Sequence, residues 1–389
     1  MSLRADVFDG WAILERELPT NYRALAETMG LIHPVPPQLK AKVSDASDLL
    51  RLLLHHATGS SSLELTTARA GATGLPMISA VALHKWERKA GPWLGALVVD
   101  MHRADGANAD FVGETVGGYK LVVVDGTTLS RPGAPGTTAR IHYAIRLPGL
   151  EIVRSEVTDV HGGETLRRFD VQPGELWMGD RAYGTPPSVA AVVNQHGDVL
   201  VRINKTNLPL FTPKETPIDI DAELTAVAER DVPVERVAYV HGPEGEIIRG
   251  RLCTLWLPEP QAVLARARTR REKREKGEKV TADALRTAEY VIVFTTADAK
   301  RIPTDLVFRL YRARWQVELQ MKRSKSIGHV DRLPNFRDDT IATWLYGNLL
   351  MQQIARRLAD RDAAFPPSGS RAQHPSRDTS QVEPAARAA

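Results

Sequence analysis

The stretch "KLVVVDGTT" constrains the fold of this chain most, because an apolar run leads directly to an aspartate and a glycine. Val122, Val123 and Val124 are consecutive, which is typical of a strand buried on both faces of a sheet. Asp125 and Gly126 follow at once, and such a pair favours the end of a strand. We therefore expect Asp125 at the end of a central strand.

Further strands and helices follow in an order that narrows the fold. Alternating side chains predict strands at 139–146 and 150–159, a short helix follows at 164–169, and residues 176–178 form a strand leading to Asp180. A helix at 186–196 and a strand at 198–204 complete the series. This order predicts a mixed α/β fold with a ribonuclease-H-like core, in which the first and fourth strands end side by side. Asp125 and Asp180 should then lie together.

Two carboxylates in one cleft favour a bound metal. They repel each other unless a positive charge offsets them. Hard divalent cations suit this role, because Mg²⁺ takes oxygen ligands and keeps open positions for phosphate, and we expect Mn²⁺ to substitute. Each aspartate taken alone also fits a turn or a helix cap. The metal site is therefore a hypothesis that depends on the two residues meeting.

The segment "YRARWQVELQMKRSK" has a polar stripe when it is drawn as a helix. At about 100° per residue, one face carries Tyr311, Arg314, Glu318, Lys322 and Lys325. Apolar residues flank this stripe on both sides: Leu310, Val317 and Met321 on one, Phe308, Trp315 and Leu319 on the other. We therefore expect the charged groups to be enclosed and to meet each other, a metal or a ligand. The alternative is a set of salt bridges within the helix.

Such a stripe suits phosphoryl transfer in nucleic acid. Glu318 can complete an acidic triad with Asp125 and Asp180 that holds two metals about 3.5 to 4 Å apart. Arg314 can contact a phosphate through two hydrogen bonds, and the lysines at 322 and 325 can hold neighbouring phosphates. We therefore assign the triad to metal binding and catalysis, and the basic residues with Tyr311 to DNA binding.

These residues resemble a known signature. Tyr311, Arg314, Glu318 and Lys325 match the pattern Y-x2-R-x3-E-x6-K without a gap. Asp125 in "VVVDGTT" and Asp180 in "DRAYG" are similar to the two aspartates that accompany it. The chain thus resembles the bacterial insertion-sequence transposases with a DDE catalytic triad, in the IS-four family and its YREK branch.

The resemblance implies a fold, an activity and partners. It implies a ribonuclease-H-like core with a β-rich insertion before the glutamate helix, and metal-dependent cleavage at transposon ends followed by strand transfer to target DNA. A cut-and-paste route through a hairpin is implied, with double-stranded DNA as the partner and a homodimer in the synaptic complex. In related transposases a tryptophan of the insertion stacks on an extruded base, and Trp256 is the candidate here, although it can equally be a core residue of its strand.

With 389 residues the chain can form two or three domains. We expect a helical DNA-binding region at 1–105, the first part of the core at 106–205, the insertion at 206–297, the second part of the core at 298–361 and a disordered tail at 362–389.

Helices at 63–69 and 79–88 form a candidate helix-turn-helix, in which Lys85, Arg88 and Lys89 would contact DNA. The run from Ala265 to Lys279 contains eight basic and three acidic residues and is either a solvated helix or a DNA-facing element.

Other function classes find no support. The chain shows no phosphate-binding P-loop, no dinucleotide fingerprint and no histidine spacing of a zinc site. Neither a signal peptide nor a run of about 18 apolar residues is present, so we expect a cytoplasmic, nucleoid-associated protein without membrane contact. Cys253 is expected to be a buried hydrophobe. The alternatives to a transposase are a nuclease of the same fold that lacks strand transfer, and a DNA-binding remnant without catalysis.

Overall fold

The structure is a computed structural model of the full chain. It describes residues 10–32, 43–59, 61–108, 115–203, 206–228, 232–315, 317–318, 321–322, 325, 333 and 338–364. By contacts the chain divides into two units, of which the larger spans Leu18–Gln353. In the smaller unit the described residues are 10–17 and 354–364, and Arg361 Nη2 lies 2.7 Å from Glu17 Oε1 there.

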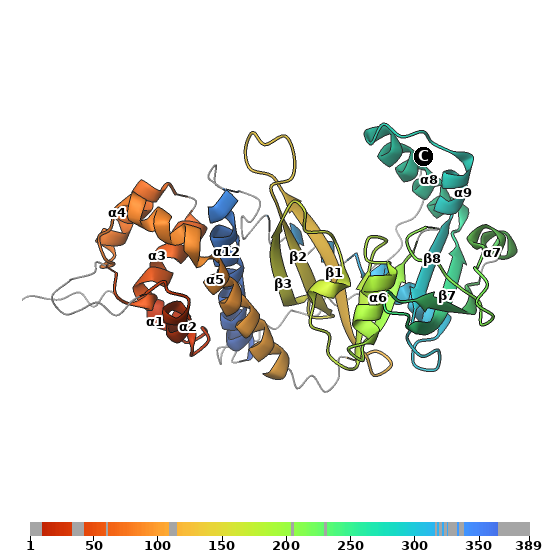
Figure 1. The fold of residues 1–389 in the computed structure, drawn as a ribbon, viewed down its shortest axis with the longest axis horizontal. Helices are drawn as coiled ribbons and strands as arrows, with labels where there is room; N and C mark the ends of the chain where they lie inside the picture. Colours follow the sequence, from red (N-terminus) through yellow and green to blue (C-terminus); the bar gives the residue numbers. More distant parts are fainter. Residues whose placement is uncertain are drawn as a thin grey trace, which may run out of the picture. The chain divides into compact units, whose positions relative to one another are not determined.

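One eight-stranded sheet runs through the larger unit, in the order β3-β2-β1-β4-β5-β8-β7-β6 (Figure 1). The strands are β1 (Lys120–Leu129), β2 (Ala139–Leu147), β3 (Glu151–Asp159), β4 (Glu175–Gly179), β5 (Asp198–Arg202), β6 (Val234–His241), β7 (Ile247–Trp256) and β8 (Tyr290–Thr295). The first five lie in the order that the sequence predicts, with β1 antiparallel to β2 and parallel to β4. The mixed α/β class is confirmed.

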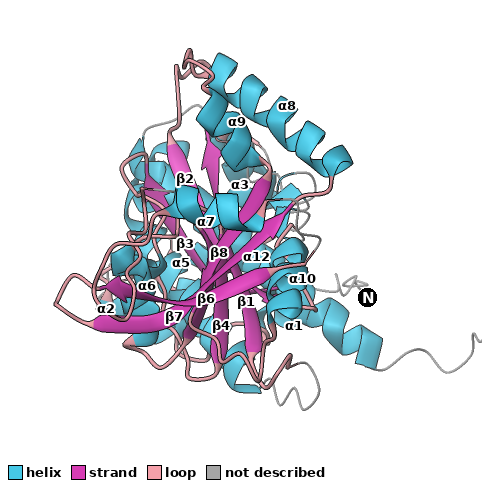
Figure 2. Ribbon diagram, turned by 90° about the vertical axis from the view of Figure 1, so that its right-hand side faces the viewer, coloured by secondary structure: helices cyan, strands magenta, loops and turns pink. Residues whose placement is uncertain are grey.

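The predicted insertion extends this sheet. Strand β8 pairs antiparallel with β5, and β7 and β6 follow in turn, so residues 234–295 continue the sheet of the core. Cys253 lies fully buried on β7, as expected. The basic run forms helix α8 (Glu259–Glu275), which packs against α9 (Ala282–Ala288) beside β8 (Figure 2). Helix α7 (Ile220–Val227) contacts β7.

Helix α6 (Pro186–Val193) and the short 3₁₀ helix η1 (Leu166–Arg168) cover one face of the sheet centre. Val122 and Val124 point to this face because side chains alternate along a strand. The buried cluster there includes Leu166, Phe169, Trp177, Tyr183, Val189, Val192, Val199 and Val201. Apolar burial on this scale gives the sheet its main stabilisation, and it holds the ends of β1 and β4 in place.

The regular elements described between residues 10 and 108 are all helical. They are α1 (Trp11–Glu15), α2 (Tyr22–Thr28), α3 (Ala46–Gly59), α4 (Leu63–Ala72) and α5 (Ala80–Asn108). The prediction that the last of these helices ends at residue 88 was wrong. The helix continues past Pro92 because the apolar residues beyond it, among them Trp93, Leu94 and Leu97, are fully buried.

Helix α5 packs on strand β3 and against helix α12 (Asp338–Ala364). Thr343 Oγ1 donates a hydrogen bond to the carbonyl oxygen of Glu87, and the hydroxyl of Tyr346 accepts one from the amide of Val157 at 3.1 Å. Because α2, α3 and α4 also contact α5, this helix joins them to the sheet. The domain boundaries remain predictions, and residues 365–389 of the predicted tail lie outside the described residues.

No helix in the described part of the chain is both long and apolar enough to cross a membrane.

We expect Gly250→Ala to destabilise the protein, because β7 packs closely against its neighbour. A Cβ at Gly250 would contact the Phe294 ring and lie 2.7 Å from the carbonyl oxygen of Thr295. Overpacking of this kind costs about 1 to 3 kcal/mol, so the midpoint of thermal unfolding should fall. Gly136→Ala is the control, because nothing lies within 4 Å of a Cβ there. Equal midpoints for both variants would contradict the close packing.

Candidate active site

Asp125 lies in the middle of β1, and the prediction that it ends the strand was wrong. Strand β1 continues because it remains paired with β2 as far as Leu129. Its parallel pairing with β4 does stop, however, at Val123 and Met178. Beyond that point the edge of β1 is open, and Asp125 lies beside the opening.

Asp180 directly follows β4, as predicted, and begins a tight turn. Its Oδ1 accepts a hydrogen bond of 2.9 Å from the amide of Ala182, which fixes the side chain in an Asx turn. Gly179 permits this turn, because a Cβ there would lie 2.7 Å from the Cβ of Tyr183. The glycine before Asp180 thus lets Tyr183 pack beneath the end of β4.

Arg314 joins two of the predicted carboxylates. Its Nη1 lies 3.8 Å from Asp125 Oδ2, and its Nη2 lies 3.9 Å from Glu318 Oε1. The Arg314 side chain is only 17% exposed, and its guanidinium carbon lies 5.8 Å from the centre of the Tyr311 ring. Tyr311, Arg314 and Glu318 of the polar stripe therefore lie together, and Asp125 joins them through Arg314.

The stripe does not lie on one continuous α-helix. Helix α10 (Thr304–Ala313) ends at Ala313 with Arg314 as its C-cap, and the amides of Arg314, Val317 and Glu318 donate hydrogen bonds to carbonyls three residues earlier, at 3.0 to 3.2 Å. These are the hydrogen bonds of a 3₁₀ turn, which is tighter than an α-helix. Trp315, predicted to help enclose the stripe, is 51% exposed. The enclosure is therefore incomplete on that side.

Burial raises the pKa of Asp125 to about 6. The guanidinium of Arg314 and the amide of Gly126, which donates a 2.9 Å hydrogen bond to Asp125 Oδ1, oppose this rise. The negative charges of Asp180 and Glu164 add to it. Asp125 and Asp180 are therefore close enough for their charges to interact, as predicted.

Sequence reasoning missed two residues near these carboxylates. Glu164, which had been assigned only to a short helix, contributes to the raised pKa of Asp125. Burial also raises the pKa of Glu164 itself, and the charge of Asp180 raises it further. Tyr183 is fully buried beneath the site. No local pattern could indicate these residues, because their position depends on how loops fold back onto the sheet.

The remaining predicted residues keep roles that their positions do not test. Lys322 is exposed and Lys325 is half-buried. Trp256 ends β7, three strands from β4, and packs partly buried against the core cluster. Lys85 and Arg88 are exposed near the start of α5. The roles assigned to these residues stay predictions, and the packing of Trp256 favours its alternative role in the core.

A cleft of about 420 Å³ connects the Asp180 turn with the insertion. Arg181 lines it from the turn, and Glu272, Lys273 and Lys276 line it from the region of α8. Four exposed basic residues of this region have no ion pair with any described residue: Arg270, Arg274, Lys276 and Lys279. Arg268 and Arg271, by contrast, pair with glutamates one turn on, at 2.7 and 3.6 Å.

The family described as "Transposase DDE domain" matches residues 117–352, which is more than half of the chain. The chain belongs to the DDE transposase family. Its resemblance to bacterial insertion-sequence transposases is thereby confirmed, and it is an enzyme that acts on DNA.

Two relatives from Escherichia coli extend the similarity over most of the chain. One is the "Putative transposase InsL for insertion sequence element IS186A" of strain K12, 29% identical over 334 residues, which cover 84% of this chain and 89% of the relative. The other is the "Transposase for insertion sequence element IS421", 29% identical over 335 residues with the same coverage. The transposase spans nearly the full length of both.

Membership of the DDE family implies a divalent metal, and the oxygen donors of this transposase suit a hard cation. The negative charge of Asp180 is close enough to Asp125 to contribute to its raised pKa. Across the described ranges, however, no three acidic, histidine or cysteine side chains stand close enough to hold one ion. The guanidinium of Arg314 contacts Asp125 through Nη1 and Glu318 through Nη2. It therefore lies between these two carboxylates and keeps Glu318 apart from Asp125. Glu318 is 52% exposed, so its side chain has room to turn inward.

The raised pKa of Asp125 predicts how Asp125→Asn changes stability with pH. The folded pKa of about 6 lies above the ordinary 3.8, so the ionised carboxylate destabilises the fold above pH 6. A shift of about two units corresponds to about 3 kcal/mol. In EDTA at about pH 7.5 the variant should therefore be more stable than the wild type by up to about 3 kcal/mol.

Near pH 4 this difference should shrink to less than about 1 kcal/mol, because the aspartate is then protonated in the folded state and partly protonated in the unfolded state. Urea unfolding at both pH values measures this difference in the free energy of unfolding between the variant and the wild type. A difference that is the same at both would show that packing, not charge, separates the proteins. Adding Mg²⁺ should stabilise the wild type only, since a ligand stabilises the state that binds it.

Proposed function

We propose that this transposase moves an insertion sequence by cutting DNA at the element's ends and joining the 3′ hydroxyls to target DNA, with Mg²⁺ as the metal. The convergence of Asp125, Asp180 and Glu318 around Arg314 carries the proposal. The two relatives described above are transposases of insertion sequences, and their similarity covers 84% of this chain. Mn²⁺ should substitute, because the donors are all oxygen atoms.

In this proposal Asp125, Asp180 and Glu318 would hold the metal ions, and the ions would supply activation of the attacking oxygen and stabilisation of the leaving oxygen. Asp125 would bind a cation as the ionised carboxylate, because a positive charge nearby would lower a pKa that burial raises most and the charges of Asp180 and Glu164 raise further. Arg314 then exchanges its contact with Glu318 for a DNA phosphate, to which a guanidinium can donate two hydrogen bonds. Tyr311, beneath the guanidinium, keeps it oriented.

The finer steps follow from the family resemblance. A cut-and-paste route through a hairpin, a homodimer in the synaptic complex and base stacking by Trp256 are part of the proposal. The proposal also places DNA along α8 and along the start of α5. The cleft at Arg181 supports the first surface, because it brings basic residues of the α8 region next to the Asp180 turn. Lys85 and Arg88, exposed near the start of α5, form the second surface.

Replacing one triad carboxylate should lower the cleavage rate by about 10²-fold or more without abolishing DNA binding. Asp125→Asn, Asp180→Asn and Glu318→Gln each remove one charged ligand at nearly constant volume. Loss of one group that stabilises reacting charge lowers rates by about 10²- to 10³-fold. DNA affinity in EDTA should be unchanged or higher, because one negative charge is removed.

Cleavage and strand transfer are measured on duplexes that carry the inverted repeats flanking the element. Asp170→Asn and Glu244→Gln are the controls, because both residues are exposed. Cleavage at the wild-type rate in any triad variant would remove that residue from the proposal. Cleavage without joining in the wild type would identify a nuclease, and binding without cleavage would identify a non-catalytic remnant.

Neutralising unpaired arginines of α8 should weaken the salt dependence of DNA binding. Each phosphate contact contributes about 0.9 to the slope of log affinity against log salt. Arg270→Gln with Arg274→Gln should therefore reduce the slope by about 2 in fluorescence anisotropy on random duplex DNA. The matched control is Arg268→Gln with Arg271→Gln, because these arginines already pair with glutamates. Equal slopes for both double variants would mean that α8 is only a solvated helix.

A further inference from the structure

Helices α8 and α9 stand beyond one end of strands β7 and β8 (Figure 1, Figure 2). Arg266 holds the first half of α8 in place, because its Nη1 lies 2.6 Å from Glu289 Oε1 and its Nη2 lies 2.6 Å from Glu259 Oε1. Ala262, one turn earlier, is fully buried. The helix is therefore fixed along one side, while most of its other side chains face solvent.

Three neighbouring stripes run along α8, each turned by about 100° from the one before it. The inner stripe consists of Ala262, Arg266, Thr269 and Lys273, the arginine stripe of Val263, Ala267, Arg270 and Arg274, and the paired stripe of Leu264, Arg268, Arg271 and Glu275. The inner stripe lines the cleft at Arg181 through Thr269 and Lys273. All the residues of the other two stripes are exposed.

The two exposed stripes differ in charge. In the paired stripe Arg268 and Arg271 each lie beside a glutamate one turn on, at 2.7 and 3.6 Å. Arg270 and Arg274, by contrast, have no ion pair with any residue that the structure describes. The arginine stripe contains no acidic residue of its own. It therefore carries two positive charges about 6 Å apart along the helix axis.

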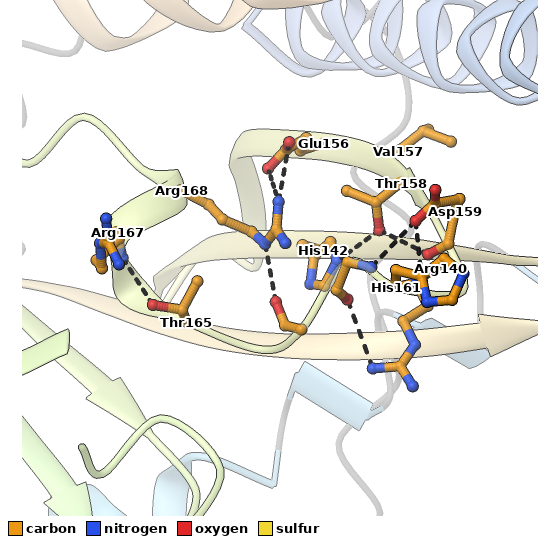
Figure 3. A network of polar contacts seen from close by, with 12 residues as sticks. Arg140, His142, Glu156, Val157, Thr158, Asp159, His161, Thr165, Arg167 and Arg168 are labelled. Carbon is orange, nitrogen blue, oxygen red and sulfur yellow. Dashed lines mark hydrogen bonds and ion pairs between the residues drawn. The ribbon is translucent and has the colours of Figure 1, made fainter. Parts of the chain in front are cut away.

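Arg168, beside the sheet, shows what an arginine with a structural role looks like. Its Nη1 contacts both carboxylate oxygens of Glu156, at 3.1 and 3.2 Å, and its Nε donates a 2.9 Å hydrogen bond to the carbonyl oxygen of Gly163 (Figure 3). Such an arginine is committed to the fold. Arg270 and Arg274 make no such contact within the described part of the chain, so they remain available to a partner with negative charge.

The arginine stripe suits the backbone of nucleic acid. The spacing of about 6 Å between Arg270 and Arg274 is close to two nucleotide steps of about 3.4 Å along one strand. Contacts to phosphates carry no sequence information. The other two members of the stripe, Val263 and Ala267, have no side-chain group that can hydrogen-bond to a base. The arginine stripe therefore fits duplex DNA of any sequence.

The cleft and the arginine stripe do not fit one straight duplex. The cleft lies between the inner stripe and Arg181, so DNA in it would lie beside the Asp180 turn. The arginine stripe points about 100° away, on a helix roughly 10 to 12 Å thick. Duplex DNA is stiff over about 150 base pairs, so it would have to bend sharply round α8 to contact both surfaces. Two such surfaces suit two duplexes.

We propose that the arginine stripe of α8 binds the target DNA, while the cleft beside the Asp180 turn holds the element's end. The inference rests on the strand transfer proposed above, which needs both DNA partners at once. It assigns each partner to a different side of one helix. The target, which is held through its phosphates, lies on the side that offers no means of reading sequence.

The first test measures how the full chain, bound to one equivalent of an unlabelled end duplex, binds a fluorescent duplex of random sequence without metal. Arg270→Gln with Arg274→Gln should weaken this second binding at least about 10-fold, because two phosphate contacts contribute about 1.8 to the slope of log affinity against log salt. Affinity for the end duplex should change less than the affinity for the second duplex. The matched control, Arg268→Gln with Arg271→Gln, should alter neither affinity.

The second test follows the reaction in Mg²⁺. At limiting target DNA, Arg270→Gln with Arg274→Gln should yield about 10-fold less joined product per cleaved end than the wild type. Raising the target concentration should restore the yield, because the variant has lost affinity for the target and not the chemistry of joining. Thermal unfolding shows whether each variant is folded, which is expected because the arginines are exposed.

Equal weakening of end binding and of second-duplex binding would overturn the proposal, because one duplex would then cover both surfaces. Second-duplex binding at the wild-type level in the arginine variant would also overturn it, since the arginine stripe would then be only a solvated face. A wild type that cleaves ends and never joins them would overturn the strand transfer of the proposed function. That result differs from a loss of joining that is confined to the variant.

Discussion

The burial of neighbouring carboxylates is the constraint on which the rest of this structure depends. The parallel pairing of β1 with β4 brings Asp125 and Asp180 close together. Burial there raises the pKa of Asp125, because it disfavours the ionised carboxylate. The arrangement costs free energy, and the hydrophobic packing of the sheet must offset it. Val122, Val124 and Trp177 are fully buried directly behind these carboxylates. A catalytic group thus persists in a geometry that an isolated loop could not maintain.

Arg314 supplies the counter-charge from a second part of the chain. Its contacts of 3.8 and 3.9 Å are longer than hydrogen bonds, so they act as electrostatic attraction with little directional demand. The same residue ends α10 and begins the 3₁₀ turn that leads to Glu318. Val307, Phe308 and Leu310 anchor α10 in the core. A change in the partner of Arg314 can therefore alter the turn while the helix before it stays in place.

Sequence reasoning reached the first five strands, the place of Asp180 after β4 and the meeting of Arg314 with Glu318, because strands and helix faces follow from local periodicity. The adjacency of β1 and β4 came from the order of these elements along the chain. It placed the end of β1 wrongly, since the pairing of β1 with β2 beyond Asp125 is a contact between strands that no single segment shows. It ended α5 too early, because burial beyond Pro92 outweighs the local preference of proline to stop a helix. Glu164 was missed because its proximity to Gly126 joins two segments that are 38 residues apart in the sequence, which no single segment shows.

The antiparallel pairing of β5 with β8 has a consequence for how this chain can evolve. The polypeptide leaves the core after Arg202 and returns at Tyr290 alongside the strand it left, with Leu200 opposite Thr295. The segment between Arg202 and Tyr290 is therefore held at both ends by the pairing of β5 with β8. Doubling the length of a flexible loop within it would cost only about 0.6 kcal/mol of loop-closure entropy. Segments can be gained or lost between these two points without moving β1 against β4. Changes in the segment between β5 and β8 can thus alter which molecules it contacts, while the register of β1 against β4, which brings Asp125 to Asp180, stays the same.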